Sequence, residues 1–219
     1  MAFQKLLKEM SPEKFAETVC SLQDEPRVSI VTKDETYILP KGLICGSSAY
    51  FDRVFKGSFK EALESKLELD DVTKEQFDLV IQWIYAGSLK YDSPPEIAPS
   101  ALLSKYITFT RLVDRFDLCG DIKPVYEEVL RIFSDNGHDV LTAEHIRDAL
   151  KLPVGHDVRN AIVKNCAIIF LDDYQFRFEK ELVEIQGFSN VLFLVLKACI
   201  QHSSGGIRGS LSGTISIND

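Results

Sequence analysis

The 219-residue sequence has no apolar run long enough to cross a membrane. Its most apolar stretch, Val191–Leu196, has six residues, whereas a membrane-spanning helix needs about 20. The first ten residues, MAFQKLLKEM, lack the continuous apolar core of a signal peptide. We therefore expect neither a membrane segment nor a secretory leader.

Cysteine is also sparse, with five residues and thus an odd count. That density is far below what a disulfide-stapled fold requires. The sequence contains no N-X-S/T glycosylation site either. These absences favour reduced thiols in an intracellular protein, either cytoplasmic or nuclear.

Basic residues are in the minority, with 25 Lys and Arg against 33 Asp and Glu, which makes the net charge −8. A protein that binds a phosphate backbone needs a basic face. The charge balance therefore predicts that nucleic acid is not a partner.

The residue patterns of catalytic and metal sites are missing. The four histidines fall in no ligand spacing, and neither H-E-x-x-H nor C-x-x-C occurs. We interpret these histidines as solvent-exposed, and we expect no metal, no cofactor and no enzymatic activity. An enzyme would need a bound metal or a deep pocket lined by His145 and Cys166.

What the sequence does contain is an ordinary globular composition, 45% hydrophobic and 26% charged. Residues 1–22 show helical spacing, and Ser11 followed by Pro12 restarts the helix. From Arg27 the period changes to two, which predicts a short hairpin reaching Leu39 and a further strand at 67–69. After that, every predicted element is a helix.

Two of these helices have clear boundaries. Thr73 and Gln76 form a capping box, and Gly87 is typical of a helix end. A helix over roughly 99–116 follows a Ser-Pro-Pro linker, and helical spacing continues to Gln201. The last residues, 203–219, are rich in Ser and Gly and are predicted to be a flexible tail.

One aromatic residue, Phe59, stands in a polar stretch that follows a glycine. Periodicity alone cannot bury it, so it could anchor another protein's groove. It could equally fold back onto the helix that carries Tyr50 and Phe55. Both interpretations stay open from the residues alone.

Several segments, in unbroken order over residues 25–130, resemble the BTB/POZ domain. They are VSIVT from Val28, YILPKGLI from Tyr37, SSAYFDRVF from Ser47, LELDDV from Leu67, FDLVIQWIYAG from Phe77 and LVDRFDL from Leu112. The remainder to Gln201 resembles the helical extension of short filamentous-fungal BTB proteins.

The resemblance implies an α+β fold, with a small, mainly antiparallel sheet flanked by helical hairpins and followed by an all-helical C-terminal region. It divides the chain into an N-terminal helical segment (1–24), a BTB/POZ domain (25–133), a C-terminal helical region (134–202) and the tail (203–219).

The resemblance also implies protein interaction rather than catalysis. Family members that bind a cullin carry a hydrophobic-x-Glu triplet before the strand that matches 67–69, and Phe59-Lys60-Glu61 occupies that place. Other family contact positions fall on Tyr50, Asp52, Asp71 and Phe116. The implied function is an adaptor that joins a cullin-based ubiquitin ligase to an unknown substrate. The alternative is a homo-oligomerising scaffold, transcriptional or signalling, without a ubiquitin role.

Two departures from the family concern its homodimer. Arg27 replaces the usual Asp of the first strand, and Pro40-Lys41 replaces the usual His-Arg pair. Arg27 opposite Lys41 would place like charges together, so either the dimer is disfavoured or Arg27 turns to solvent. The N-terminal residues could pack on a second subunit or on their own core; they are Phe3, Leu6, Leu7 and Met10.

Overall fold

The computed structural model describes residues 7–91, 97–172 and 176–203. The chain forms two compact units. Unit 1 comprises Met1–Pro94 and Thr108–Val125, and unit 2 comprises Pro95–Ile107 and Tyr126–Asp219. The expectations for Phe3, Leu6 and the tail from 204 onward lie outside the described residues.

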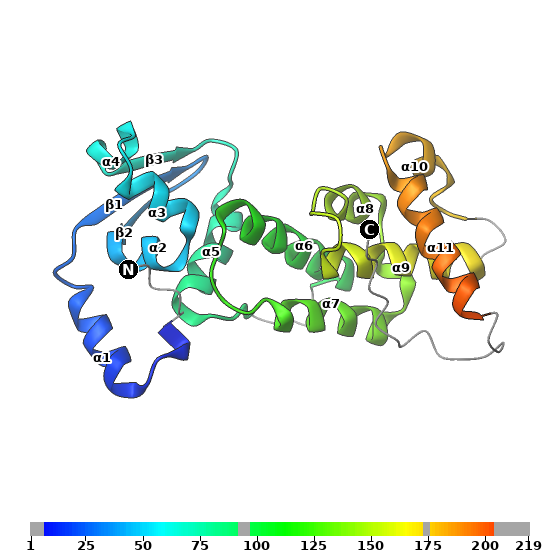
Figure 1. The fold of residues 1–219 in the computed structure, drawn as a ribbon, viewed down its shortest axis with the longest axis horizontal. Coiled ribbons are helices and arrows are strands. Elements are labelled where there is room, and N and C mark those ends of the chain that lie inside the picture. The colour runs from blue at the N-terminus through cyan, green and yellow to red at the C-terminus, as the bar shows by residue number, and fades with distance from the viewer. Residues whose placement is uncertain (1–6, 92–96, 173–175, 204–219) are drawn as a thin grey trace. The chain divides into compact units, whose positions relative to one another are not determined.

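Unit 1 contains the sheet, and Figure 1 labels its elements. In chain order the elements that precede the linker are η1 (Leu7–Glu9), α1 (Pro12–Ser21), β1 (Arg27–Thr32), β2 (Thr36–Pro40), α2 (Lys41–Ser47), α3 (Ala49–Lys56), α4 (Lys60–Glu64), β3 (Lys66–Leu69) and α5 (Lys74–Ala86). The elements that follow the linker are α6 (Pro99–Phe116), α7 (Lys123–Asn136), η2 (His138–Val140), α8 (Ala143–Ala149), α9 (Asp157–Asp172), α10 (Glu179–Glu184) and α11 (Phe188–Ser203).

The sheet has the order β2-β1-β3 and is mixed. Strands β1 and β2 form the expected antiparallel hairpin, in which Val28 faces Leu39. Strand β3 instead runs parallel to β1, with Ile30 facing Leu67. Parallel strands need a long crossover, and α2, α3 and α4 supply it. The α+β class is thus confirmed, whereas only one of the two strand pairings is antiparallel.

One face of this sheet is buried because its strands alternate in polarity. Val28, Ile30 and Leu67 point inward, and Tyr37 of β2 places its ring 4.8 Å from Phe77 of α5. Beneath the sheet, the rings of Phe51, Phe77 and Phe116 lie 5.1–6.5 Å apart between centroids. The core of unit 1 is therefore an aromatic cluster shared by α3, α5 and α6.

Local capping signals explain where these helices begin and end. The Ser48 hydroxyl accepts a hydrogen bond from the Phe51 amide at the start of α3. The capping box of Thr73 and Gln76 opens α5, as the sequence predicts. Gly87 ends α5 with φ of +61°, a conformation that favours glycine.

The N-terminal segment packs only partly on its own core. Leu7 is buried, and the Lys8 ammonium donates a hydrogen bond to the Gly87 carbonyl and lies 5.3 Å from the Trp83 ring centroid. Helix α1 is capped by Ser11 as expected, but it buries none of its residues. Leu7 is thus buried within its own chain, whereas no residue of α1 is fully buried.

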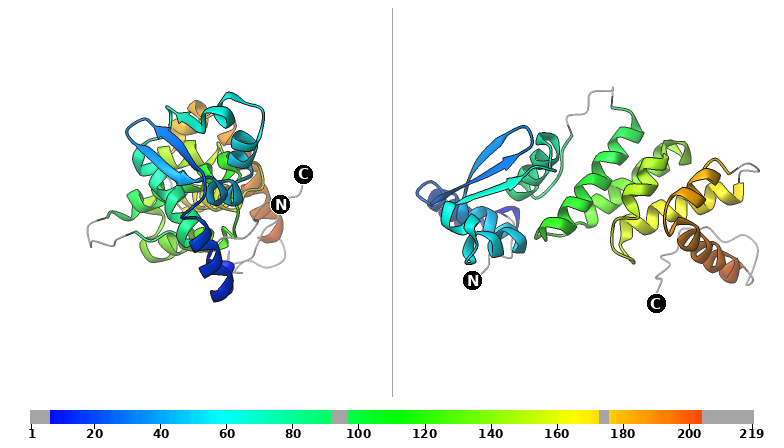
Figure 2. Two further views of the ribbon diagram at one scale, coloured as in Figure 1. Left: turned by 90° about the vertical axis from the view of Figure 1, so that its left-hand side faces the viewer. Right: turned by 90° about the horizontal axis from the view of Figure 1, so that it is seen from above.

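Unit 2 is built from helices, and α8 and α11 both pack against α9 (Figure 2). Its buried side chains are mostly aliphatic or small, with two buried polar residues, His145 and Asn165. The expectation that the histidines are exposed is wrong for His145. Its Nδ1 accepts the Thr142 amide in a capping box, and its Nε2 lies 2.7 Å from the Ser104 hydroxyl, so hydrogen bonds offset the cost of burial.

Candidate protein-interaction surface

Phe59, the aromatic residue that the sequence left undecided, is 60% exposed. It is the residue before α4, and its ring lies against the backbone of Gly57. A Cβ built at position 57 would stand only 2.9 Å from the ring carbon Cδ2 of Phe59. The ring therefore rests on a glycine surface and stays outside the core that contains Phe55.

The residues after Phe59 form the short helix α4, where the sequence predicts a loop. Five residues are too few to show a helical period, so the pattern gave no signal. Glu61 lies in the first turn and is half-buried. Leu63, four residues after Phe59, is 86% exposed. The sequence reasoning missed Leu63, which follows Phe59 by one turn, with its amide donating to the Phe59 carbonyl.

The predicted contact at Phe116 is wrong as a direct contact, because this side chain is 0% exposed. It packs under Tyr50, at 5.4 Å between ring centroids, and the Arg115 guanidinium lies 5.2 Å above its ring. Tyr50 itself is half-buried. Phe116 thus supports the surface from beneath, because its helical position turns the ring toward the aromatic cluster.

The two other predicted contacts, Asp52 and Asp71, are held by ion pairs. Arg115 donates to both carboxylate oxygens of Asp71, at 2.6 and 2.9 Å, and this pair holds the pKa of Asp71 below its usual range. Asp52 pairs with Lys56 one turn later on α3, at 2.5 Å, and the hydrogen bond raises the pKa of Lys56. Arg115 therefore favours the charged form of Asp71, and Asp52 lies within ion-pair distance of Lys56 on the same unit.

Residues 22–116, which include all six predicted contact residues, match the family model of the BTB/POZ domain. They form a BTB/POZ domain. A BTB/POZ domain is a protein-interaction module, so residues 22–116 are the part of the chain suited to bind another protein.

Curated relatives of this BTB/POZ chain include Kelch-like protein 15 of mouse, rat and human. Each is 26% identical over 125 residues, which is 56% of this chain and 20% of the relative. The chain therefore spans about a fifth of the length of these relatives.

The two residues that the resemblance assigns to a dimer pocket, Arg27 and Lys41, differ in their exposure. Arg27 is exposed, and it stands opposite Pro40 at the end of the hairpin. The Glu25 carboxylate, which the sequence reasoning missed, accepts the Gly42 amide at 2.8 Å near the start of α2. Lys41, the first residue of α2, is half-buried. Arg27 is thus exposed in the single chain, and both alternatives, a disfavoured dimer and an Arg27 that turns to solvent, stay predictions.

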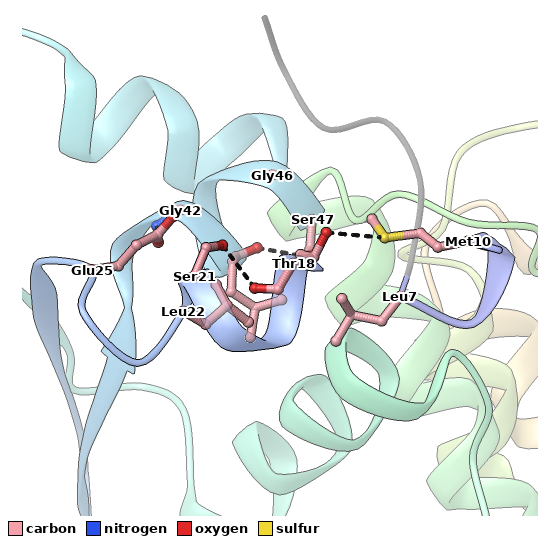
Figure 3. Close-up of a pocket in the computed structure, with 10 residues that line it drawn as sticks. Leu7, Met10, Thr18, Ser21, Leu22, Glu25, Gly42, Gly46 and Ser47 are labelled. Atoms are coloured by element: carbon pink, nitrogen blue, oxygen red, sulfur yellow. Dashed lines mark hydrogen bonds between the residues drawn. The ribbon is translucent and has the colours of Figure 1, made fainter. Parts of the chain in front are cut away.

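A small pocket lies between the N-terminal segment of the BTB/POZ unit and α2 (Figure 3). Leu7 and Met10 line one end and Glu25 with Gly42 the other. Its volume is about 30 Å³, well below the ~300–1,000 Å³ of small-molecule sites. The pocket therefore has no room for an organic cofactor.

Neither residue that an enzyme hypothesis would use lies in this pocket. Cys166 is buried on α9, and burial raises the pKa of its thiol to about 12, so the thiol stays protonated. His145 is engaged in its capping box. Within residues 7–91, 97–172 and 176–203, no cluster of three or more His, Cys, Asp or Glu side chains could hold a metal ion.

Within the part of the chain that the structure describes, no helix combines the length and the apolarity needed to cross a membrane.

Proposed function

We propose that the BTB/POZ domain of this chain binds a cullin scaffold, and that the chain acts as an adaptor of a cullin-based ubiquitin ligase. The observation that carries this proposal is the exposure of Phe59 two residues before Glu61, directly ahead of β3. This is the place at which the BTB/POZ resemblance puts the hydrophobic-x-Glu triplet of cullin-binding members.

The way in which Phe59 is held suits a binding anchor. Its ring rests on Gly57, so it needs little reorganisation before it enters a partner's pocket. A buried aromatic anchor contributes on the order of 2–4 kcal/mol to binding when it is surrounded by a polar rim. We assign Tyr50, Asp52 and Asp71, which belong to the same unit, to that polar rim.

The second unit is the part that we propose binds the substrate. Its last helix, α11, buries one apolar face against α9 and exposes another, formed by Phe193, Leu194 and Ile200. Apolar side chains that gather on a surface favour contact with another protein.

The test is a titration of the purified chain with the N-terminal domain of cullin-3. Replacing Phe59→Ala together with Glu61→Ala should weaken binding by at least 30-fold, because the pair removes the anchor and its neighbouring charge. Phe193→Ala is a matched control, because this residue is 65% exposed but lies in unit 2. The proposal is refuted if the double variant binds as tightly as the unaltered chain, or if the unaltered chain does not bind.

A homo-oligomeric scaffold is the second candidate, and helix α1 favours it. None of its ten residues is buried, and Phe15 on this helix is exposed, so a second chain could cover it. Light scattering distinguishes the two states, since the chain mass is 24.7 kDa. A mass near twice this value that falls to one chain in Phe15→Glu would support the scaffold, and a monomeric unaltered chain would exclude it.

A further inference from the structure

A second apolar anchor lies one helical turn after Phe59. Among the described residues of unit 1, Leu63 is the most exposed large apolar side chain, and no residue of α4 is fully buried. An isolated exposed leucine is common on protein surfaces. Leu63, however, follows the exposed Phe59 by one turn, because the Leu63 amide donates to the Phe59 carbonyl, so two exposed apolar side chains leave the chain at neighbouring positions.

The position of α4 is fixed without the use of these two side chains. The helix packs against α3 on one side and leads into β3 on the other, where Leu67 is buried. At its C-terminal end Ser65 adopts a left-handed conformation with φ of +51° and ends the helix. Because the neighbouring elements hold α4, Phe59 and Leu63 are both available to a partner in a defined geometry.

Charge defines the kind of partner that fits these two side chains. The segment from 60 to 71 contains five carboxylates and two ammonium groups. One ammonium, Lys60, is paired with Glu64 at 3.6 Å, and Glu61 lies between the two apolar residues. A groove that accepts the two apolar side chains therefore needs an apolar floor and a basic rim.

We infer that Leu63 is the second anchor of the cullin-binding surface, and that Phe59 and Leu63 enter one apolar groove of the scaffold, rimmed by basic residues. This inference rests on the proposed function. It adds a contact that the hydrophobic-x-Glu triplet does not include, and it makes α4 as a whole, rather than Phe59 alone, the element that the partner recognises.

The experiment compares single variants of the full chain in titrations with the cullin-3 N-terminal domain. Leu63→Ala should lower the affinity about tenfold, and Leu63→Glu more, because its carboxylate enters an apolar groove. Val183→Ala is the matched control: Val183 is 88% exposed and also lies on a short helix, α10, but in unit 2. Circular dichroism should show that all variants remain folded, since Leu63 takes no part in the core.

The possible outcomes separate the two claims. If Leu63→Ala and Leu63→Glu bind within twofold of the unaltered chain while Phe59→Ala loses binding, the inference about Leu63 is wrong and the proposed function stands. If Phe59→Ala also binds normally, or the unaltered chain does not bind, both are wrong. A loss in Val183→Ala as large as that in Leu63→Ala would also overturn the inference.

Discussion

The two units of this chain bury different kinds of side chain. Unit 1 has an aromatic core, and its largest fully buried residues include Trp83 and several phenylalanines. The core of unit 2 is mostly aliphatic and encloses His145 and Asn165. Of the two buried polar residues in unit 2, one is titratable, whereas those buried in unit 1 are hydroxyl groups.

This difference indicates how each unit responds to change. An aromatic cluster is sensitive to the loss of volume and indifferent to moderate changes of pH. A buried histidine is sensitive to protonation, because the charged form is poorly solvated inside a protein. Trp83 is the only tryptophan of the chain, so its fluorescence reports on unit 1, while far-ultraviolet circular dichroism reports on the helices of both units.

The largest effect should come from Phe116→Ala in unit 1. The side chain fills the space between Phe51 and Phe77, so its removal should lower the free energy of unfolding by about 3–5 kcal/mol. Urea denaturation followed by Trp83 fluorescence measures this loss. Phe59→Ala serves as the control and should change stability by less than about 0.5 kcal/mol. A cost below about 1 kcal/mol for Phe116→Ala would contradict the core position of this ring.

A smaller effect should appear in unit 2 as the pH falls. Burial lowers the pKa of His145 below its ordinary value of 6.5. Between the lowered pKa and 6.5 the unfolded chain binds more protons than the folded chain, so stability falls as the pH drops through this window, by at most about 1.4 kcal/mol per pH unit. Denaturation followed by circular dichroism between pH 7.5 and 5 measures the slope.

The control for this pH dependence is His145→Gln. Glutamine is the residue that closes the equivalent capping box of α5, where Gln76 pairs with Thr73. The variant should therefore keep the cap of α8 while losing the His145 part of the slope. Equal slopes in the variant and the unaltered chain would show that His145 does not carry the response.

The smallest effect should come from Asp71→Asn. The carboxylate pairs with Arg115 at the surface, and exposed ion pairs contribute about 0.2–1 kcal/mol. Urea midpoints at low and high salt should differ less in this variant than in the unaltered chain, because salt screens the pair. A loss above about 2 kcal/mol would mean that a surface pair matters as much to unit 1 as part of its aromatic core.

Local signals account for the elements that the sequence predicted well. The capping box at Thr73, the glycine at position 87 and the alternation from Val28 to Leu39 act over a few residues, and the structure confirms all three. Helix α4 was missed because it is shorter than two turns. The parallel pairing of β3 has no local signal, since it joins strands more than 30 residues apart.

In the candidate site too, some features follow from the local sequence and others from the packing of distant elements. The order of residues alone indicates that Phe59 precedes Glu61 in a polar stretch ahead of a strand, and the BTB/POZ resemblance implies protein partners. The packing of distant elements places Phe59 outside and Phe116 inside, and leaves Leu63 exposed one turn after Phe59. The physical reason is that exposure depends on which distant elements cover a side chain, and one residue type in similar local surroundings meets either solvent or a packed core.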